Sequence, residues 1–255
     1  MKKLLFGACA VVLLASTISG VHAAGESIKP PPQKWSFQGL FGTFDRAALQ
    51  RGFQVYNETC SVCHSLRLVA YRNLMEIGFT EDQVKKIAAA KEVADGPNDE
   101  GEMFQRPARP SDKFVKPFPN EQAARAANNG AYPPDLSLIV KARVGGADYL
   151  HALLTGYKEP PADVKMGDGM SYNVYFAGSQ IAMAPPLVED GVEYADKTKA
   201  TVAQMAQDVT TYLAWAAEPE TEDRKRIGIK AILFLIVLTG MLYAIKRKVW
   251  ADIKH

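Results

Sequence analysis

Two cysteines and a histidine are grouped in the stretch TCSVCHSL, residues 59–66. Cys60 and Cys63 are separated by two residues, and His64 directly follows the second cysteine. Covalent attachment of haem uses this spacing, because two thiols add to the two vinyl groups of the porphyrin and the next residue points its imidazole under the ring. The stretch therefore predicts one covalent haem c, with His64 as the proximal iron ligand.

Other sites that use closely spaced cysteines fit less well. A thiol–disulfide oxidoreductase places its pair at a helix N-terminus in a βαβ fold, and the chain shows no βαβ pattern. A structural zinc site needs further Cys or His ligands, and only His151 and His255 follow His64. A simple disulfide would not account for the histidine.

The second axial ligand of the iron is harder to identify. Met183 is the leading candidate, because Pro185 and Pro186 stiffen its loop, and a weak thioether ligand has to be held firmly against the iron. Ligation by His and Met raises the haem potential and leaves no open site, which suits electron transfer. Core filling is the usual role of a lone Met, and the competing candidates are His151, Met166, Met170, Met103 and Met205.

The haem propionates require a cation and hydroxyl donors. Arg143, in KARVGGADY, is followed by glycines that let the backbone approach the porphyrin, and Tyr149 is close by in sequence. Without a haem, the same pair would be a surface arginine and a core tyrosine. His64 is expected to donate its other ring nitrogen to a carbonyl, and we expect the Pro133–Pro134 segment to supply it.

Apolar segments at the two ends of the chain predict its relation to the membrane. Residues 1–23 have a Lys-Lys start, a short apolar run and small residues at the end, which is typical of a secretory signal peptide. The run 227–245 would be about 28 Å long as a helix, close to the ~30 Å hydrocarbon core, and basic residues flank it. We therefore expect a signal peptide (1–23), a periplasmic haem domain (24–223), a transmembrane helix with basic flanks (224–248) and a cytoplasmic tail (249–255).

The net charge of +2 conceals an uneven distribution. Residues 24–223 carry 20 Lys and Arg against 27 Asp and Glu, a charge of −7. Such a domain should repel nucleic acid and attract a basic partner. The stretch EVADGPNDEGE, residues 92–102, has five carboxylates and no basic residue. It is either a solvated loop or a surface that steers a basic partner.

Helical patterns dominate the expected domain. Asp45 can cap a helix that runs towards Cys60, with Gly52 beside its apolar stripe of Leu49, Phe53 and Tyr56. Strand signals are weak, and 96–120 reads as a long loop. The other expected helices are 80–91, 121–128, the segments LSLIVKAR and ADYLHALLTGY, and a strong amphipathic helix from Val202 to Ala216 that ends before Pro219 and a charged linker, 218–226.

Several longer segments carry a family resemblance. RGFQVYNETCSVCHSL, VAYRNL, DGPNDEGEMFQRPARPSD, EQAARAANNGAYPPDLSLIVKARVGGADY, LLTGYKEPP, YFAGSQIAMAPPL and DVTTYLAWAAEPE follow one another between about residues 35 and 250. In content and order they resemble the cytochrome c1 family, the haem subunit of ubiquinol–cytochrome c reductase (the bc1 complex), in its bacterial form. The resemblance covers nearly the whole chain after the signal peptide.

The resemblance implies a role for individual residues and for the chain. The implied haem-binding residues are Cys60 and Cys63 (thioethers), His64 and Met183 (iron ligands), Arg143 (propionate), and Tyr149 and Asn128 (pocket), beside the carbonyl expected from Pro134. The implied fold is mainly α: a modified class I cytochrome c domain with one C-terminal transmembrane helix. The implied enzyme is the ubiquinol–cytochrome c oxidoreductase, of which this chain would be the electron-carrying subunit.

The resemblance also implies partners and a location. Electrons would come from the Rieske iron–sulphur protein and pass to a soluble basic c-type cytochrome (c2 type), with cytochrome b as membrane neighbour in a dimeric respiratory or photosynthetic complex. The signal peptide places the chain in a bacterial inner membrane with a periplasmic haem domain. Two alternatives are a free-standing anchored shuttle, which needs a long flexible tether, and a haem enzyme or gas sensor, which would bind carbon monoxide at an open iron site.

Overall fold

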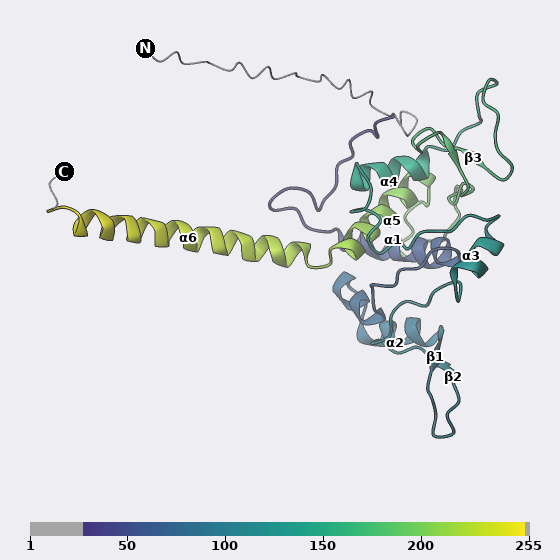
Figure 1. Ribbon diagram of the computed structural model, residues 1–255, viewed down its shortest axis with the longest axis horizontal. Coiled ribbons are helices and arrows are strands. Elements are labelled where there is room, and N and C mark those ends of the chain that lie inside the picture. The colour runs from purple at the N-terminus through teal and green to yellow at the C-terminus, as the bar shows by residue number, and fades with distance from the viewer. Residues whose placement is uncertain (1–27, 253–255) are drawn as a thin grey trace, which may run out of the picture.

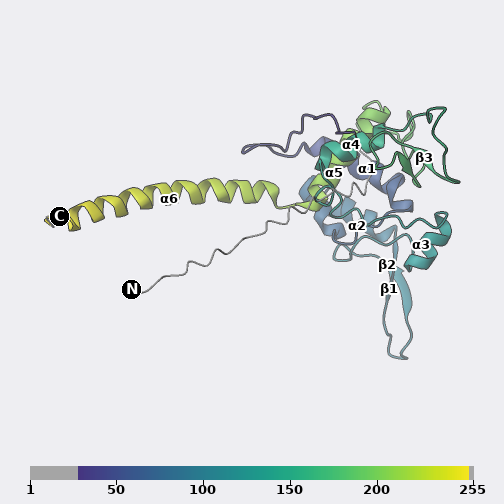
Figure 2. The ribbon, with the colours of Figure 1, turned by 45° about the horizontal axis from the view of Figure 1, so that its top comes forward.

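The computed structural model describes residues 28–252, so the predicted signal peptide and the last three residues of the predicted tail lie outside the described residues. Figures 1 and 2 show a mainly helical domain from which one long helix, α6, projects, which confirms the predicted fold class. The elements are α1 (Arg46–Glu58), the 3₁₀ helices η1 (Cys60–Val62) and η2 (Tyr71–Ile77), α2 (Glu81–Ala89), β1 (Glu92–Asp95), β2 (Phe104–Pro107), α3 (Glu121–Ala127), α4 (Gly146–Thr155), β3 (Ser171–Tyr172), β4 (Gln180–Ile181), α5 (Val202–Ala217) and α6 (Thr221–Val249).

The first helix begins where the sequence predicts. The Asp45 carboxylate accepts hydrogen bonds from the backbone N–H groups of Ala47 (2.9 Å) and Ala48 (3.3 Å), so it satisfies donors that have no partner inside the helix. The predicted stripe of α1 is buried, and so is most of the predicted stripe of α5. These side chains form one hydrophobic core between the two helices: Leu49, Phe53, Tyr56, Met205, Val209, Leu213 and Ala216.

The two core helices approach most closely at Gly52. A Cβ built on this residue would lie 2.1 Å from the backbone oxygen of Asp208 and 2.7 Å from Cβ of Tyr212, both on α5. No other residue type fits between the two backbones at this point. The close helix approach that Gly52 predicts is confirmed.

A buried ion pair fixes the register of the same crossing. Asp208 is fully buried, and its carboxylate accepts hydrogen bonds from Nε (2.8 Å) and Nη2 (3.0 Å) of Arg51. Nη1 of Arg51 donates to Asp196 at 2.8 Å, and Gln204 donates to Asp208 at 3.0 Å. The hydrogen bond with Asp208, and then that with Asp196, keeps the pKa of Arg51 above its ordinary value against the effect of burial. A charge buried in this way is stable only because it is paired.

The helix predicted for LSLIVKAR, residues 136–143, is wrong. The segment forms successive turns, and its backbone is tied to an earlier part of the chain: Leu136 N donates to Ser65 O at 2.8 Å. The hydroxyl of Ser137 accepts from Leu68 N at 3.0 Å. These contacts replace the regular hydrogen bonds of a helix, so its apolar spacing reflects two buried contacts, Leu136 and Ile139, within turns.

A β-hairpin stands where a long loop was expected. β1 pairs antiparallel with β2, from Glu92 opposite Pro107 to Asp95 opposite Phe104. Arg106 holds its base, since it pairs with Asp95 and, at 2.6 Å, with Asp112. That ion pair lowers the pKa of Asp112 to about 2. Figure 1 shows the hairpin projecting from the domain. The strands are short and exposed, so their sequence carries no clear alternation.

The membrane-spanning candidate α6 joins the domain through a short connection. The sequence predicts a charged linker over 218–226, but the structure is helical from Thr221 onward. Glu222 and Asp223 lie in the first turn, where carboxylates complement the helix dipole. Within α6, the most apolar window has a mean hydropathy of 2.2, and none of its residues is buried. The helix is therefore long and apolar enough to cross a membrane.

The lead-in segment, residues 28–44, fastens α6 to the domain. Lys225 Nζ donates to the carbonyl oxygens of Phe37 (2.6 Å) and Gly42 (2.9 Å). The carboxylate of Glu222 accepts from the backbone N–H of Phe44 (2.8 Å) and from both terminal nitrogens of Arg46 (3.1 and 2.8 Å). The junction is thus held from two sides.

Candidate haem site

The cysteine pair lies at the C-terminal end of α1. The chain leaves α1 at Thr59 and turns through η1, where the carbonyl oxygen of Cys60 accepts from Cys63 N (3.2 Å) and His64 N (2.9 Å). The hydroxyl of Ser61 donates to the Asn57 carbonyl at 2.7 Å and ties the turn to the helix. Cys60, Cys63 and His64 therefore share one short turn that is held by local hydrogen bonds.

The two thiols are unpaired and half-buried. Burial, and then the neighbouring Cys63, raises the pKa of the Cys60 thiol to about 12. Redox-active cysteine pairs require the opposite, a lowered pKa that exposes a thiolate. The surroundings of Cys60 therefore do not suit a nucleophilic thiolate.

The ring of His64 is fixed by its Nδ1 atom. Nδ1 lies 2.8 Å from the carbonyl oxygen of Pro134, and Pro134 belongs to the segment predicted from the sequence to supply the acceptor. Burial lowers the pKa of His64, and the contact with Pro134 opposes this effect. With the proton on Nδ1, Nε2 carries a free lone pair, and within residues 28–252 it has no hydrogen-bond partner. This is the tautomer that a metal-ligating histidine needs.

Asp135 clamps the histidine segment to the proline segment, a role that the sequence analysis missed. Its carboxylate accepts hydrogen bonds from the Ser65 hydroxyl (2.7 Å) and from Arg67 N (3.0 Å). Burial raises the pKa of Asp135, but hydrogen bonds from Arg67, Ser137 and Ser65 outweigh burial and lower the pKa overall. On the other side, Tyr56 of α1 donates to the His64 carbonyl at 3.2 Å. No local pattern marks either contact, because each depends on the folded chain.

Met183 follows β4, and its backbone is held by Tyr157. The Tyr157 hydroxyl donates to the Met183 carbonyl at 3.1 Å, and the Tyr157 backbone forms a bridge with Asn173. Asn173 is fully buried and donates to the Leu153 carbonyl of α4 at 2.7 Å. The Met183 loop is therefore anchored to a core helix, as a weak thioether ligand requires. Tyr157 is a second residue that the sequence analysis missed, although it ends the segment LLTGY.

The structure separates Met183 from three of its competitors. Met205 is fully buried in the core between α1 and α5. Met103 lies on the exposed hairpin, next to Gly96. The ring of His151 packs edge-on against the ring of Trp35, with 6.2 Å between the ring centroids. Met166 and Met170 lie in a turn-rich stretch before β3, so they remain alternatives by position.

Arg143 and Tyr149 lie within electrostatic reach of each other. Burial raises the pKa of Tyr149, and the positive charge of Arg143 lowers it. The guanidinium of Arg143 is exposed, and its hydrogen bond within the described residues goes to the Ala142 carbonyl at 3.1 Å, so most of its donors are available. Tyr149 in turn affects Tyr157, whose pKa is raised by burial and then by Tyr149. Arg143 therefore acts electrostatically on Tyr149, and Tyr149 acts on Tyr157. Tyr157 in turn holds Met183 by a hydrogen bond.

Asn128 is not brought into this group by a direct contact. It ends α3, and its side chain donates to the Ala124 carbonyl at 2.7 Å. Its backbone carbonyl accepts from Ala131 N at 2.9 Å, which starts the turn that leads to Pro134. Asn128 therefore shapes the proline segment through the backbone.

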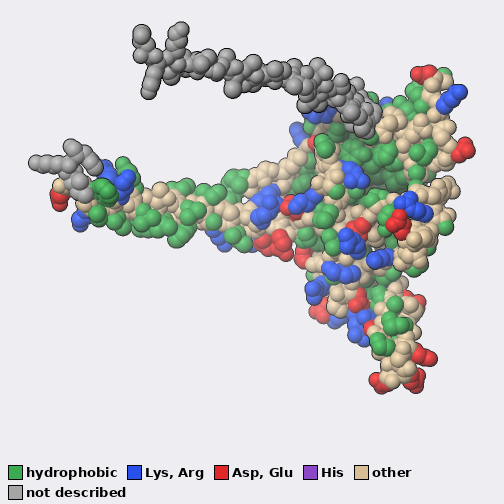
Figure 3. Space-filling model, viewed as in Figure 1, with side chains coloured by type: hydrophobic (Ala, Val, Ile, Leu, Met, Phe, Trp, Pro, Cys, Tyr) green, Lys and Arg blue, Asp and Glu red, His purple; other side chains and the backbone are tan. Residues whose placement is uncertain are grey.

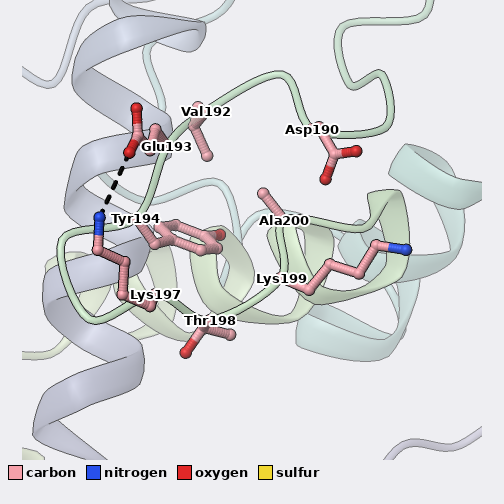
Figure 4. Close-up of a pocket in the computed structure, with 8 residues that line it drawn as sticks. All are labelled: Asp190, Val192, Glu193, Tyr194, Lys197, Thr198, Lys199 and Ala200. Atoms are coloured by element: carbon pink, nitrogen blue, oxygen red, sulfur yellow. Dashed lines mark hydrogen bonds and ion pairs between the residues drawn. The ribbon is translucent and has the colours of Figure 1, made fainter.

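Two cavities lie away from these residues. The larger, about 360 Å³, is formed by residues 190–200, where Lys197 pairs with Glu193 at 3.5 Å (Figure 4). The ring of Tyr194 in this loop lies 5.8 Å from Cζ of Arg51. The smaller cavity, about 240 Å³, lies between the lead-in segment, the end of α5 and the start of α6. Neither cavity is lined by a residue predicted to bind haem.

The donor set fits a covalent haem c. It offers two unpaired thiols at the attachment spacing, an imidazole with Nε2 free and Nδ1 fixed, and an anchored methionine. Within the described residues no three His, Cys, Asp or Glu side chains come together to hold a metal ion by themselves. A porphyrin supplies the four equatorial nitrogens, so two axial side chains suffice.

Sequence comparisons agree with a protein that carries a covalent haem c. Residues 35–253 match the model of the Cytochrome C1 family. The chain is 48% identical to "Cytochrome c1" of Rhodospirillum rubrum over 255 residues, which cover 93% of this chain and 94% of that protein. It is 50% identical to the "Cytochrome b-c1 complex catalytic subunit, mitochondrial" of Candida albicans over 240 residues, 94% and 83% of the two chains. It is also 48% identical to "Cytochrome b/c1" of Bradyrhizobium diazoefficiens over 262 residues, 94% of this chain and 38% of that longer protein.

Proposed function

Because the chain belongs to the cytochrome C1 family, whose members bind one covalently attached haem c, we propose that it is the electron-transfer subunit of a bc1 complex. The observation that carries the proposal is the fixed imidazole of His64, with Nδ1 on the Pro134 carbonyl and Nε2 free, directly beside two unpaired thiols. When bound, the haem supplies one-electron cycling of its iron between Fe(III) and Fe(II).

Each site residue has a proposed task. Cys60 and Cys63 form the thioethers, and His64 is the proximal ligand, oriented by Pro134. Met183 is the distal ligand, and Tyr157 holds its backbone. Three further residues complete the site: Arg143 pairs with a propionate, and Tyr149 and Asn128 line the pocket. Asn128 also starts the turn that leads to Pro134.

The proposed route runs from the Rieske iron–sulphur protein through this haem to a soluble basic c-type cytochrome. Two relatives carry names that support membership of the complex: one is called a subunit of the cytochrome b-c1 complex, and another, longer protein is called cytochrome b/c1. The second name supports cytochrome b as the membrane neighbour. We propose that this chain is part of such a complex and that the complex is dimeric, with proton chemistry left to other subunits.

We propose a single-pass topology in a bacterial inner membrane. Residues 1–23 act as the signal peptide, 24–223 form the periplasmic haem domain, 224–248 cross the membrane, and 249–255 form the cytoplasmic tail. The basic residues in the last turn of α6, Lys246, Arg247 and Lys248, support a cytoplasmic C-terminus.

The junction with α6 argues against a tethered shuttle. A shuttle needs a flexible connection between its haem domain and its anchor. Here α5 ends at Ala217 and α6 begins at Thr221, while Lys225 and Glu222 are bonded to the lead-in segment. A haem domain held in this way keeps its orientation relative to the membrane helix, which suits a fixed subunit.

The hairpin gives the acidic stretch a defined position. Figure 3 shows acidic side chains gathered at the end of the projecting hairpin. Asp95 is committed to Arg106, but Asp99, Glu100 and Glu102 form no ion pair with any described residue. We propose that these three carboxylates at the tip steer the basic cytochrome towards the haem domain.

Neutralising the tip should slow this encounter. The triple change Asp99→Asn, Glu100→Gln and Glu102→Gln is expected to lower the association rate with a basic cytochrome about tenfold at low ionic strength, because steering depends on charge. Stopped-flow reduction of the cytochrome across a salt series measures it. The difference should vanish at high salt, where the Debye length falls to about 3 Å. Glu193→Gln, in another surface loop, is the control; equal rates for the triple variant and wild type at low salt would return the tip to an ordinary solvated surface.

The proposed function is tested by an optical redox titration of the full-length protein in detergent, with a pyridine haemochrome assay on the same sample. We expect a c-type spectrum, a midpoint potential well above zero and no carbon monoxide binding, because both axial positions are filled. A low potential with ready carbon monoxide binding would instead indicate an open iron site and a haem enzyme or sensor.

A further inference from the structure

The smaller cavity combines an apolar wall with a cationic rim. Phe37 and Phe44 of the lead-in segment and Val140 supply apolar surface. The cations that line it are Lys141, Arg224 and Lys225, against the single carboxylate of Glu218. Three cations against one carboxylate give the cavity a net positive charge, so its ligand should be an anion.

The cations keep free hydrogen-bond donors. Lys141 Nζ and Arg224 Nη2 both donate to Glu218, at 2.8 and 3.1 Å, so two positive groups share one negative group. The side chains of Lys141 and Arg224 are about half and two-thirds exposed, and within residues 28–252 these side chains make no other hydrogen bond. An ammonium has three donors and a guanidinium five, so most of them remain available to a bound anion.

The cavity lies at the level of the lipid headgroups. The apolar run of α6 starts at Ile227, so Arg224 lies about 4.5 Å and Thr221 about 9 Å before it along the helix axis. The headgroup layer on each side of a bilayer is about 5–8 Å thick. Arg224 on the rim therefore falls within this layer when α6 spans the membrane, and Thr221 lies just beyond its outer edge.

The lead-in segment presents an apolar tip on the same side. Gly39 and Gly42 bracket a tight turn, with Gly42 N donating to the Gly39 carbonyl, and Lys225 holds both arms of the turn. Leu40 and Phe41 at the tip are 58% and 79% exposed. Figures 1 and 2 both show this purple segment reaching out on the side from which α6 leaves the domain.

We propose that this junction is a binding site for an anionic phospholipid of the periplasmic leaflet. The phosphate lies against Lys141 and Arg224, the upper acyl chain lies along the apolar wall, and Leu40 and Phe41 enter the interfacial region beside it. The site adds a second membrane contact to α6 and orients the haem domain. It goes beyond the proposed electron transfer, because neither the haem ligands nor the acidic hairpin take part.

Lipid titration of the delipidated full-length haem protein, followed by native mass spectrometry, tests the site. Wild type should bind phosphatidylglycerol more tightly than phosphatidylcholine. The double change Lys141→Gln and Arg224→Gln should weaken phosphatidylglycerol binding about 25-fold, about fivefold for each charge. Arg226→Gln is the matched control, since Arg226 lies on the same turn but pairs with Asp223 outside the cavity. The affinity of this control for phosphatidylglycerol should fall no more than about fivefold.

Two results would overturn the lipid assignment. One is a double variant that binds phosphatidylglycerol like wild type or no worse than the Arg226 control. The other is displacement of the lipid by micromolar inorganic phosphate, which would make the junction a site for free anions. An unchanged haem spectrum in every variant separates these outcomes from a failure of the haem site.

The apolar tip is tested by its depth. With Cys60 and Cys63 held in thioethers, Phe41→Cys provides a single thiol in the processed chain for a nitroxide label. In nanodiscs with phosphatidylglycerol, oxygen, which enters the membrane, should increase the spin relaxation rate of the label more than a water-soluble nickel chelate does. Val188→Cys, at an exposed position on the domain, should show the reverse. If oxygen and the nickel chelate affect the label at residue 41 as they affect the label at residue 188, the proposed membrane contact is wrong.

Discussion

Replacing Met183 with leucine should lower the midpoint potential of the haem by 0.1 V or more, within the roughly 0.8 V range that axial ligands span. Leucine has nearly the same volume but no sulfur to bind the iron. The variant should also bind carbon monoxide and lose quinol-driven reduction of the soluble cytochrome. Redox titration and carbon monoxide difference spectra on the full-length protein measure both effects.

Met166→Leu and Met170→Leu are the matched controls, because both methionines precede β3 in the same stretch of turns. Their potentials should stay at the wild-type value. A Met183→Leu protein that keeps the wild-type potential, while one of the controls loses it, would move the distal ligand to that residue. Tyr157→Phe adds a graded test: it removes the hydrogen bond to the Met183 carbonyl but not the ligand, so we expect a smaller fall in potential.

Replacing Gly52 with alanine should destabilise the domain by more than about 3 kcal/mol, at or beyond the upper end of ordinary overpacking. The new Cβ would meet the backbone oxygen of Asp208 at 2.1 Å, and a backbone atom cannot move aside as a side chain can. The helices would have to separate, which would also strain the pair between Arg51 and the buried Asp208. Denaturant titration, followed by circular dichroism and haem absorbance, measures the loss.

Gly228→Ala separates this clash from the general effect of the substitution. Gly228 is also helical, but a Cβ built there meets nothing within 4 Å. Both changes gain helix propensity of about 1 kcal/mol, so only the crossing distinguishes them. A Gly52→Ala protein as stable as Gly228→Ala would show that α1 and α5 can separate without cost.

Features that depend on neighbouring residues could be predicted from the sequence. The cap at Asp45, the stripe of α1, the close approach at Gly52 and the long C-terminal helix all follow rules that operate within a few turns. The cysteine–histidine spacing belongs to the same class, since attachment to a porphyrin edge is a local requirement. These features carry most of the fold and the covalent half of the site.

Features that depend on distant contacts could not be predicted in the same way. Asp135 clamps Ser65, which is 70 positions away, and Tyr157 holds Met183 from 26 positions away. The same kind of contact explains the wrong helix: the bond between Leu136 and Ser65 overrides the apolar spacing of the segment. The β-hairpin was missed because an ion pair of Arg106, and not a hydrophobic face, holds its base.

The order of the site segments along the chain bears on how the protein is made. Cys60, Cys63 and His64 come first, Pro134 follows 70 positions after His64, and Met183 comes later still. A chain that emerges from its N-terminus therefore exposes both thiols before the segments that close the pocket exist. We expect haem to attach to the cysteines on this still open chain, with the Pro134 and Met183 segments joining His64 afterwards. A variant that cannot bring Pro134 and Met183 into place should then accumulate with haem already attached.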